Sequence, residues 1–539
     1  MRNTFRAACA TLLLSLAAGF AVPAAAADAA PPGDLLALGR ALYLEGRRAD
    51  GSPLVAGRPG GSQLAGAEVA CVSCHRRSGL GGMEGRNYIP PVTAEALFTA
   101  MPTGKGPSAL GDGRPAYAQA SLAHALRDGR DTSGRPLDYL MPRYRLNEQE
   151  VQGLQAYLRT LPEMQAAESG ALHFATVIAP DVAPERSEAM LGVLQACFDE
   201  HNAGPLPEQG RHKLAPAMSQ REARPWELHV WKLQGPQETW AAQLEQRAGA
   251  QPVFALVGGI GGAQWAPVHG FCERSGLPCL FPHLEAAGAE ATGFYPLYLG
   301  KGALLEAGLV ARHVAQQPDG AAKRVTQVLR EHDAAAEAAA AAVRQSLAEQ
   351  GVATREVRIP AQVPLAPDLF PRVQADETLV LWLRPDDLQR LGDVPPSGAQ
   401  VIVSATLARR DDVPLAPAWK ARTLMAYPYE LPQQRDRRMA PVRQWLQQRG
   451  LPLTEERVQA DAFVACKALR TAMLDARDHL GRDYLVERVE ADMERTTATG
   501  LYPRLALGIG QRFASKTGYL VRFDESNGGL AAVGERVAP

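Results

Sequence analysis

Cys71, Cys74 and His75 are the residues of this chain best suited to chemistry. Two cysteines two residues apart, followed at once by histidine, form the attachment pattern of c-type haem. In that pattern each thiol forms a thioether to the haem edge, and the adjacent imidazole binds the iron. Zinc half-sites and redox dithiols share the cysteine spacing, but zinc needs a second Cys/His pair, which the neighbouring sequence lacks, and a dithiol has no need of the histidine. The pattern therefore predicts one covalently bound haem c.

The second ligand of the iron must come from a residue well downstream of His75. Met141 is the best candidate because it lies on a proline-stiffened stretch, residues 140–144, just before a predicted helix, and a thioether is a soft ligand suited to haem iron. Met83 is close to His75 in the chain, and Met101 fits either a core or a loop position. We expect a six-coordinate His75/Met141 iron that carries electrons. An iron without Met141 would have an open position, which suits peroxidase-like chemistry.

Two predicted helices frame these residues. The first follows Asp34, its expected N-cap, and the second follows Asn147, with Glu150 three residues later as in a capping box. Gly39 on the first helix and Tyr157 on the second would let the two helices cross closely. Each helix has an apolar face at helical spacing: Leu35, Leu38 and Leu42 on the first, and Val151, Leu154, Leu158 and Leu161 on the second.

Residues 34–162 resemble a small monohaem cytochrome c with His/Met ligation. The resemblance rests on the helix containing residues 39–43, the motif at 71–75, and the stretch 140–144 with the helix after it. It implies an all-α domain that carries one haem c. It also implies that the ring N–H of His75 donates to a backbone carbonyl on a proline-containing loop, for which Pro90 and Pro91 are in position.

Residues 1–27 have the features of a secretory signal peptide. Arg2 and Arg6 precede an apolar run over residues 7–22, and small residues then offer a cleavage site after Ala27. We therefore expect an exported, periplasmic protein. No later stretch of sequence is apolar for long enough to span a bilayer, so the mature chain is expected to lack an integral membrane segment.

Four cysteines remain once the haem motif and the signal peptide are set aside: Cys197, Cys272, Cys279 and Cys466. In an oxidising compartment such cysteines pair. Residues 274–278 have the composition of a turn, so a disulfide between Cys272 and Cys279 is expected. The sequence leaves open whether Cys197 pairs with Cys466.

Length and composition indicate more than one domain. A chain of 539 residues is too long for one ordinary core, and its formal net charge of −1 argues against nucleic acid as a partner. All 7 tryptophans lie beyond residue 220, whereas the earlier region is rich in Gly, Pro and Arg. We place a linker at residues 163–170.

From residue 171 onward, predicted strands alternate with predicted helices, which indicates parallel sheets of the doubly wound kind. Strands are expected at 173–178, 227–233, 252–257, 324–330, 356–359, 378–383 and 400–404, and helices at 184–202 and 334–349. The glycine-rich stretch 258–262 lacks the Lys and Ser/Thr of a phosphate-binding loop, and Gln264 stands where a dinucleotide-binding pattern needs glycine. We expect a tight strand-to-helix turn at a ligand cleft there.

Residues 171–525 resemble a type I periplasmic solute-binding protein of the branched-chain amino acid and amide kind, followed by a C-terminal tail at 526–539. The resemblance rests on the order of several stretches: the first strand and helix, then 258–264, 276–282, 295–298, 304–313, 324–325, 462–465 and 502–519. It implies two α/β lobes that close over a small polar solute. The solute contacts it implies are Gly259, Gly261, Pro282, His283, Tyr298, Arg384 and Tyr427. The Ser and Thr hydroxyls usual after the third and fourth strands are missing here, which weakens the case for an amino acid ligand.

The two resemblances together predict an exported electron-transfer protein in which a haem c module is coupled to a solute-binding module. Its expected partners are a small solute and a periplasmic redox protein such as a dehydrogenase. Three alternatives remain open. They are a solute receptor for an ABC importer with an accessory haem, a peroxidase-like haem enzyme with an open iron site, and an electron carrier whose second domain is only a docking scaffold.

Overall fold

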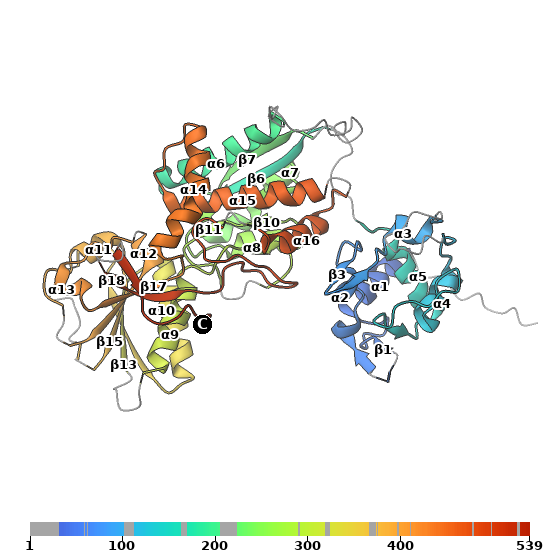
Figure 1. Ribbon diagram of the computed structural model, residues 1–539, viewed down its shortest axis with the longest axis horizontal. Helices are drawn as coiled ribbons and strands as arrows, with labels where there is room; N and C mark the ends of the chain where they lie inside the picture. Colours follow the sequence, from blue (N-terminus) through green and yellow to red (C-terminus); the bar gives the residue numbers. More distant parts are fainter. Residues whose placement is uncertain are drawn as a thin grey trace, which may run out of the picture. The chain divides into compact units, whose positions relative to one another are not determined.

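The computed structural model describes residues 32–58, 60–61, 63–101, 113–162, 170–204, 224–288, 292–317, 324–365, 373–374, 376–395, 398–409, 411–476, 479–496, 499–524 and 529–539. The expected signal peptide and most of the expected linker lie outside these residues. The chain divides into two compact units (Figure 1). Residues up to Ser73 form the first unit together with Phe98–Arg159, and Cys74–Leu97 form the second together with Thr160–Pro539.

Two crossing helices, α1 (Pro32–Glu45) and α5 (Glu148–Leu158), organise the first unit. They approach so closely that a Cβ atom added to Gly39 would lie 1.9 Å from the carbonyl oxygen of Gly153 and 2.9 Å from Cβ of Tyr157. Only glycine fits that position, so the predicted close crossing is confirmed. The rings of Tyr43 and Tyr157 pack beside it with centroids 5.3 Å apart.

The two predicted N-caps have different outcomes. Asn147 caps α5 as expected, because its side chain accepts from the backbone N–H of Glu150 at 2.9 Å and the Glu150 carboxylate accepts from the Asn147 N–H at 2.9 Å. The cap at Asp34 is wrong, because α1 begins at Pro32 and Asp34 lies in its first turn. Proline is favoured at the first helical position, where its missing N–H costs nothing, and Asp34 still favours the helix through its charge.

The first unit also contains a small antiparallel sheet, an addition to the all-α expectation. The sheet has the order β2 (Gln63–Ala65), β1 (Val55–Gly57), β5 (Arg143–Tyr144). The remaining elements are η1 (Gly66–Val69) and α4 (Gln119–Asp128). The hydroxyl of Tyr144 donates to the carbonyl of Val69 at 2.8 Å, which ties β5 to the segment just before the haem motif. Helices α2 (Val72–His75) and α3 (Ala94–Phe98) contain the two junctions between the units.

Residues 74–97 belong to the second unit, and two of their side chains bond to α16 (Arg482–Met493). Arg76 pairs with Glu490 at 2.7 Å. Ser78 Oγ donates to the buried carboxylate of Glu487 at 2.6 Å. The hairpin β3 (Gly82–Glu84) and β4 (Asn87–Ile89) lies in this segment.

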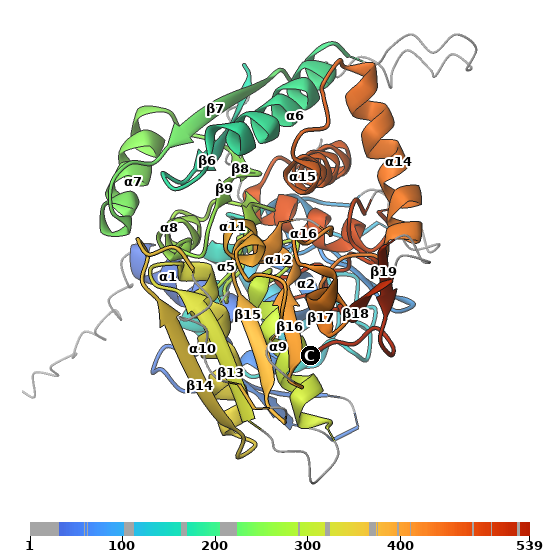
Figure 2. The ribbon, with the colours of Figure 1, turned by 90° about the vertical axis from the view of Figure 1, so that its left-hand side faces the viewer.

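The rest of the second unit has two α/β lobes. The first lobe has a parallel sheet of order β11–β9–β6–β8–β10–β12, with β7 beside β6. Figure 2 labels β6, β7, β8 and β9 of this sheet. Its strands are β6 (Leu172–Ile178), β7 (Trp226–Lys232), β8 (Ala255–Val257), β9 (Ile260–Gly261), β10 (Cys279–Leu280), β11 (His283–Leu284) and β12 (Pro296–Leu297). Its helices are α6 (Pro184–Asn202), η3 (Gln237–Thr239), α7 (Trp240–Ala250) and α8 (Ala266–Arg274).

The second lobe has a sheet of order β14–β13–β15–β16–β17–β18–β19, in which the first five strands are parallel and the last two antiparallel. Its strands are β13 (Arg324–Arg330), β14 (Ala353–Ile359), β15 (Thr378–Trp382), β16 (Gln400–Ser404), β17 (Thr423–Tyr427), β18 (Tyr519–Asp524) and β19 (Gly529–Ala532). Its helices are α9 (Ala303–Ala315), α10 (Ala334–Ala348), α11 (Pro385–Gln389), α12 (Ala405–Ala408) and α13 (Pro417–Lys420).

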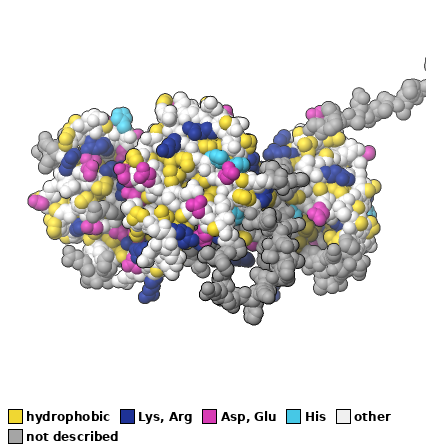
Figure 3. Space-filling model, turned by 90° about the horizontal axis from the view of Figure 1, so that it is seen from above, with side chains coloured by type: hydrophobic (Ala, Val, Ile, Leu, Met, Phe, Trp, Pro, Cys, Tyr) yellow, Lys and Arg dark blue, Asp and Glu magenta, His cyan; other side chains and the backbone are white. Residues whose placement is uncertain are grey.

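Two further long helices, α14 (Pro432–Gln448) and α15 (Glu456–Asp475), precede α16. The structure joins Cys197 on α6 to Cys466 on α15, and it joins Cys272 on α8 to Cys279 on β10. In the described part of the chain, no helix has both the length and the apolar character needed to cross a bilayer. On the face drawn in Figure 3, basic and acidic side chains are interspersed, in keeping with a formal net charge of −1.

The predicted parallel α/β architecture is confirmed, and several elements match to the residue: α6, β13 and β16. The strand expected at 252–257 is shorter, because the backbone ladder of β8 starts only at Ala255. The glycine-rich stretch does form a tight turn, with φ of +60° at Gly258 and +113° at Gly259.

Candidate functional site

The haem attachment motif coincides with the short helix α2, except that Cys71 directly precedes the helix. Two hydrogen bonds of Ser73 fix the start of this helix to the segment before it. Its N–H donates to the carbonyl of Ala70 at 3.0 Å, and its hydroxyl donates to the carbonyl of Ala67 at 3.0 Å. Cys71 and Cys74 are half-buried, and neither takes part in a disulfide. Because both thiols are partly exposed, a haem can reach them before it covers them.

His75 has the surroundings of an iron ligand. It is 7% exposed, and its Nδ1 lies 2.9 Å from the carbonyl oxygen of Pro90, which confirms the expected bond to the proline-containing loop. Because Nδ1–H donates to this carbonyl, Nε2 is the nitrogen that remains for the iron. Burial lowers the pKa of His75, against a smaller opposite effect of the Pro90 bond, so the ring is held in the neutral form that binds metal. The donor set therefore fits haem c.

The loop that supplies the Pro90 carbonyl depends on a glycine. Gly81 has a φ of +69°, and a Cβ atom there would lie 2.2 Å from the carbonyl oxygen of Ile89. Its N–H donates to the carbonyl of His75 at 3.1 Å. The close approach of these two backbone segments holds the ring of His75 in one orientation.

The three methionines considered for the second axial position differ in their surroundings. Met141 is half-buried; its N–H donates to the carbonyl of Asp138 at 3.1 Å, and its carbonyl accepts from the guanidinium of Arg143. Met83 is 66% exposed on β3, and Met101 is half-buried and bonded through its backbone to Arg114 at 2.9 Å. Met141 stays our prediction for the ligand.

A cavity of about 500 Å³ lies between the two lobes of the second unit. Charged and polar groups line much of it: Arg186, His283, Glu285, Thr406, Arg409, Asp411, Arg435, Glu455, Glu456, Arg457, Asp461, Tyr502 and Ser515. In the first lobe, Pro282 follows β10, Glu285 follows β11, and Leu299 and Gly300 follow β12. The carboxyl ends of parallel strands are where α/β folds usually bind ligands. The arrangement is that of a binding cleft for a polar molecule.

Glu285 connects the two lobes, because its carboxylate bonds to arginines from both of them. Its carboxylate accepts two bonds from Arg384, at 2.9 and 2.8 Å, one from Arg409 at 3.0 Å and one from Arg186 at 3.3 Å. Arg384 also bonds Asp333, the N-cap of α10, at 2.7 Å. Burial alone would raise the pKa of Glu285, but Arg384, Arg409 and Arg186 outweigh burial and lower the pKa to about 2. The carboxylate is therefore charged at neutral pH.

A second group of charges faces the cavity from α14 and α15. Asp411 pairs with Arg435, and with Arg457 at 3.1 Å. The guanidinium of Arg457 also lies over the ring of Tyr429, 4.5 Å from its centroid. Because Arg435 and Arg457 are both paired with Asp411, all three charged side chains of this wall are held in place.

Asp461 provides an unused hydrogen-bond acceptor. Its Oδ2 lies 2.7 Å from Nδ1 of His283, whose Nε2 is 3.0 Å from Arg186. Asp461 is 5% exposed, and among the described residues its Oδ1 has no hydrogen-bond partner. The Oγ atom of Ser515, 1% exposed, also lacks one within the described chain. Buried polar atoms are nearly always bonded, so these two atoms await a donor or acceptor from a solute or from water.

The structure places two of the seven predicted solute contacts, Pro282 and His283, in the cavity wall. Tyr298 lies in a core, 3% exposed, with its hydroxyl 2.8 Å from Nδ1 of His269. Tyr427 is fully buried, and its hydroxyl accepts from Arg435; the neighbouring Tyr429 lines the cavity instead.

Three further predicted contacts lie outside the residues that line the cavity. Arg384 is turned to Glu285 and Asp333. Gly259 and Gly261 pack on the ring of Trp265, with added Cβ atoms 3.4 and 2.9 Å from it. The tight packing of the turn against Trp265 favours glycine at both positions.

Sequence reasoning missed Glu285, Asp411, Arg457 and Asp461. Asp461 carried a usable signal, because it is an acidic residue within the otherwise apolar run 460–465 of a predicted helix. Glu285 follows the predicted contact His283 by two residues. Asp411 and Arg457 carried no comparable signal.

Comparison with known families identifies the N-terminal region. Residues 60–162 match the family model for cytochrome c. This region is a cytochrome c domain. Its family implies a covalently bound haem c and an electron-carrying role, in agreement with the donor set of the 71–75 motif. Comparison with curated proteins gave no match.

The second unit has an α/β fold with mainly parallel sheets, and the chain is similar to several solved structures of ABC transporter substrate-binding proteins. A fatty acid ABC transporter substrate-binding protein from Thermomonospora curvata is 14% identical over 69% of this chain and 94% of that chain, with a TM-score of 0.47. A branched-chain amino acid ABC transporter from Thermus thermophilus with bound valine is 10% identical over 69% and 98%, with a TM-score of 0.47. A substrate-binding protein from Sphaerobacter thermophilus is 15% identical over 68% and 98%, with a TM-score of 0.49. None of them identifies a ligand for this chain.

Proposed function

We propose that this protein is an exported, periplasmic electron-transfer protein in which one His75/Met141-ligated haem c is coupled to a solute-binding module. A small solute would occupy the cleft between the lobes, and a periplasmic redox protein such as a dehydrogenase would exchange electrons with the haem. Bound haem c supplies a one-electron couple. The residues of the chain hold the cofactor through two thiols, keep the His75 ring neutral and oriented, and shield it from water.

The proposal that the protein binds a solute rests on Asp461 in the cavity wall, whose Oδ1 has no hydrogen-bond partner among the described residues. A carboxylate oxygen accepts but does not donate, so a complementary solute offers an ammonium, amide or hydroxyl donor at that point. The nearby hydroxyls of Ser515 and Thr406 can serve the polar remainder of such a molecule. We therefore propose a small polar solute with at least one hydrogen-bond donor.

The proposed coupling between the solute cleft and the haem is supported by the residues that directly follow His75. Arg76 and Ser78 bond Glu490 and Glu487 on α16, and Arg512 also pairs with Glu490. The segment after Arg512 leads to Ser515 in the cavity wall. A solute that shifts this segment would therefore also shift residues next to His75. Such a shift would change the reduction potential of the haem.

A thermal-shift screen of the haem-loaded full chain tests the solute-binding half. The compounds are amino acids, amides, alcohols, aldehydes and aromatic acids. A ligand present at a hundredfold excess over its dissociation constant stabilises the native state by about 2.7 kcal/mol. The hit should disappear in Asp461→Asn and persist in Asp475→Asn, which changes an exposed carboxylate on the same helix.

The coupling is tested by redox titration of the same protein with and without the solute found. A shift in haem potential is expected. An unchanged potential with the solute demonstrably bound would refute coupling and favour an independent solute receptor. A screen without any hit, together with six-coordinate low-spin iron, would refute solute binding and favour a docking scaffold.

A further inference from the structure

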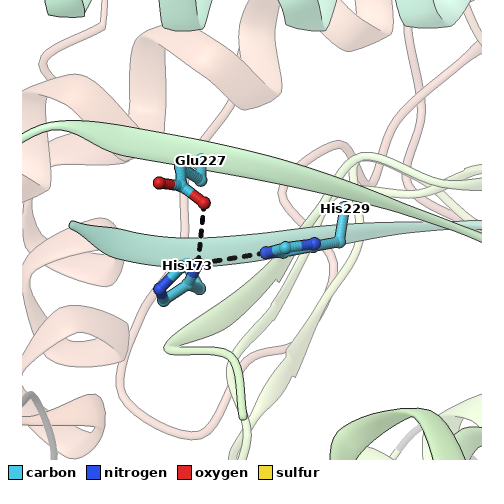
Figure 4. Close-up of side chains that lie close together, drawn as sticks. All are labelled: His173, Glu227 and His229. Carbon is cyan, nitrogen blue, oxygen red and sulfur yellow. Dashed lines mark hydrogen bonds and ion pairs between the residues drawn. The ribbon is translucent and has the colours of Figure 1, made fainter. Parts of the chain in front are cut away.

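The side chains of His173, Glu227 and His229 lie close together on the first lobe (Figure 4). His173 on β6 lies directly opposite Glu227 on β7 in the register of these parallel strands. His229 follows Glu227 by two residues, so the pleat directs both side chains to the same face of the sheet. The three side chains therefore meet because of strand register and not because of a flexible loop.

The distances within this cluster suit a single cation. Nδ1 of His173 lies 3.0 Å from Nε2 of His229 and 3.3 Å from Oε2 of Glu227. One potential ligand atom from each residue lies within 4.8 Å of the other two. Zinc binds nitrogen and carboxylate oxygen at about 2.0–2.2 Å in tetrahedral geometry, which separates two ligand atoms by about 3.3 Å. Small side-chain adjustments thus bring all three atoms onto one ion.

The backbone that carries the ligands is firmly held. The carbonyl of His173 accepts from the N–H of Phe254 at 2.7 Å, which anchors it to the segment before β8. The neighbouring Leu172 donates its N–H to the carbonyl of Pro225 at 2.7 Å. Ligands on regular, bonded strands lose little freedom when a metal binds, which favours affinity.

Exposure leaves room for a further ligand. The side chain of His173 is 32% exposed and that of Glu227 is 56% exposed. A metal held by three protein atoms here has an open position for water, as in zinc sites with two histidines and one glutamate. The two imidazoles select against calcium and magnesium, which prefer oxygen ligands.

The cluster is separate from the solute cleft. His173 is the second residue of β6, so the cluster lies near the amino ends of β6 and β7. Cavity residues such as Pro282 and Glu285 instead follow the carboxyl ends of strands in the same sheet. Among the described strands β7 pairs only with β6, so a metal bridging the two would fasten an edge strand to the sheet.

We propose that His173, Glu227 and His229 form a binding site for a divalent transition-metal cation of borderline softness, Zn²⁺ or Cu²⁺, which stabilises the first lobe. Imidazole suits both ions, and Cu²⁺ generally binds such a site more tightly. The site does not depend on the proposed solute or on the haem.

The test uses the full, haem-loaded chain without an affinity tag, freed of metals with a chelator and kept oxidised so that Cu²⁺ is not reduced. Calorimetric titration with ZnCl₂, CuCl₂ and CaCl₂ at pH 7.5 measures binding. We expect saturable binding of Zn²⁺ and Cu²⁺, a rise in melting temperature, and no response to Ca²⁺. The electron paramagnetic resonance spectrum of the Cu²⁺ form should show coupling to two nitrogens.

Variants decide whether these three residues are the ligands. His229→Gln and Glu227→Gln should weaken Zn²⁺ binding at least about tenfold, since even outer groups of metal sites contribute 10–100-fold. The control is His124→Gln, which removes an exposed histidine paired with Asp128 at 2.7 Å. Circular dichroism of each variant checks that it folds. Unchanged Zn²⁺ affinity in a folded His229→Gln protein, or no binding by the original chain, overturns the proposal.

Discussion

Replacing Glu285 by glutamine removes the charge that holds three arginines from both lobes together. Arg186 comes from the first lobe, whereas Arg384 and Arg409 come from the second. In Glu285→Gln the three guanidiniums face one another with a neutral group among them. The expected result is a less stable second unit and weaker contact between its lobes.

The pKa of Glu285 sets the size of the effect. A decrease from the ordinary 4.5 to about 2 corresponds to about 3 kcal/mol of preferential stabilisation of the charged form. The residue is 6% exposed, so solvent screens this interaction little. A lowered carboxyl pKa gives stability that is fully present above 4.5 and is lost as the pH falls towards 2. The difference between the original chain and the variant should therefore shrink over that interval.

Urea unfolding followed by tryptophan fluorescence measures this, because all 7 tryptophans lie beyond residue 220 and so report on the second unit. The free energy of unfolding is compared at neutral pH and at several values between 5 and 2.5. Glu245→Gln is the control, since its side chain is 60% exposed and pairs with an exposed Arg274. It should change stability by less than about 1 kcal/mol.

Two results would refute the reasoning about Glu285. One is a Glu285→Gln protein as stable as the original at pH 7. The other is a loss of stability that does not diminish as the pH falls from 4.5 towards 2. Either would mean that the arginines are held by other groups.

Three further changes have defined outcomes. Met141→Leu should abolish the sulfur–iron charge-transfer band of the oxidised haem, whereas Met83→Leu should retain it; a retained band in the Met141 variant contradicts the ligand assignment. Burial, partly offset by hydrogen bonds from Ser404 and Thr406, raises the pKa of Glu306 to about 7. Its contribution to stability is therefore complete below 4.5 and falls by up to about 3 kcal/mol as the pH rises to 7; denaturation of Glu306→Gln should lack this slope. Gly39→Ala should destabilise the cytochrome domain by several kcal/mol because its Cβ meets the backbone of α5. Gly57→Ala, with open space around the added Cβ, should not; equal melting temperatures for the two would contradict the crossing argument.

Local patterns predicted local structure well. The 71–75 motif, the Asn147 capping box and the helix at 184–202 each depend on residues a few positions apart, and each is present as expected. The N-cap at Asp34 failed because two competing start signals, Pro32 and Asp34, stand two residues apart.

Of the residues predicted for the binding cleft, Pro282 and His283 line the cavity, but the charged network around Glu285 was not predicted. This network pairs Glu285 with an arginine 99 positions later and His283 with Asp461, 178 positions later. Such pairs depend on how two lobes meet, which no local pattern encodes. The aromatic residues expected there are buried in the cores: Tyr298 directly follows β12 and Tyr427 ends β17. Residues shortly after them, Leu299 and Tyr429, line the cavity.

The disulfide between Cys197 and Cys466 closes a loop of 269 residues. Strands β13 to β17, the parallel part of the second lobe, all fall within that loop. A protease that cut the chain anywhere between the two cysteines would therefore leave one covalent molecule, and the fragments would separate only after reduction. The same closure ties α6 to α15 permanently, so any opening of the cleft must occur in the segments that cross between the lobes and cannot come from parting these two helices.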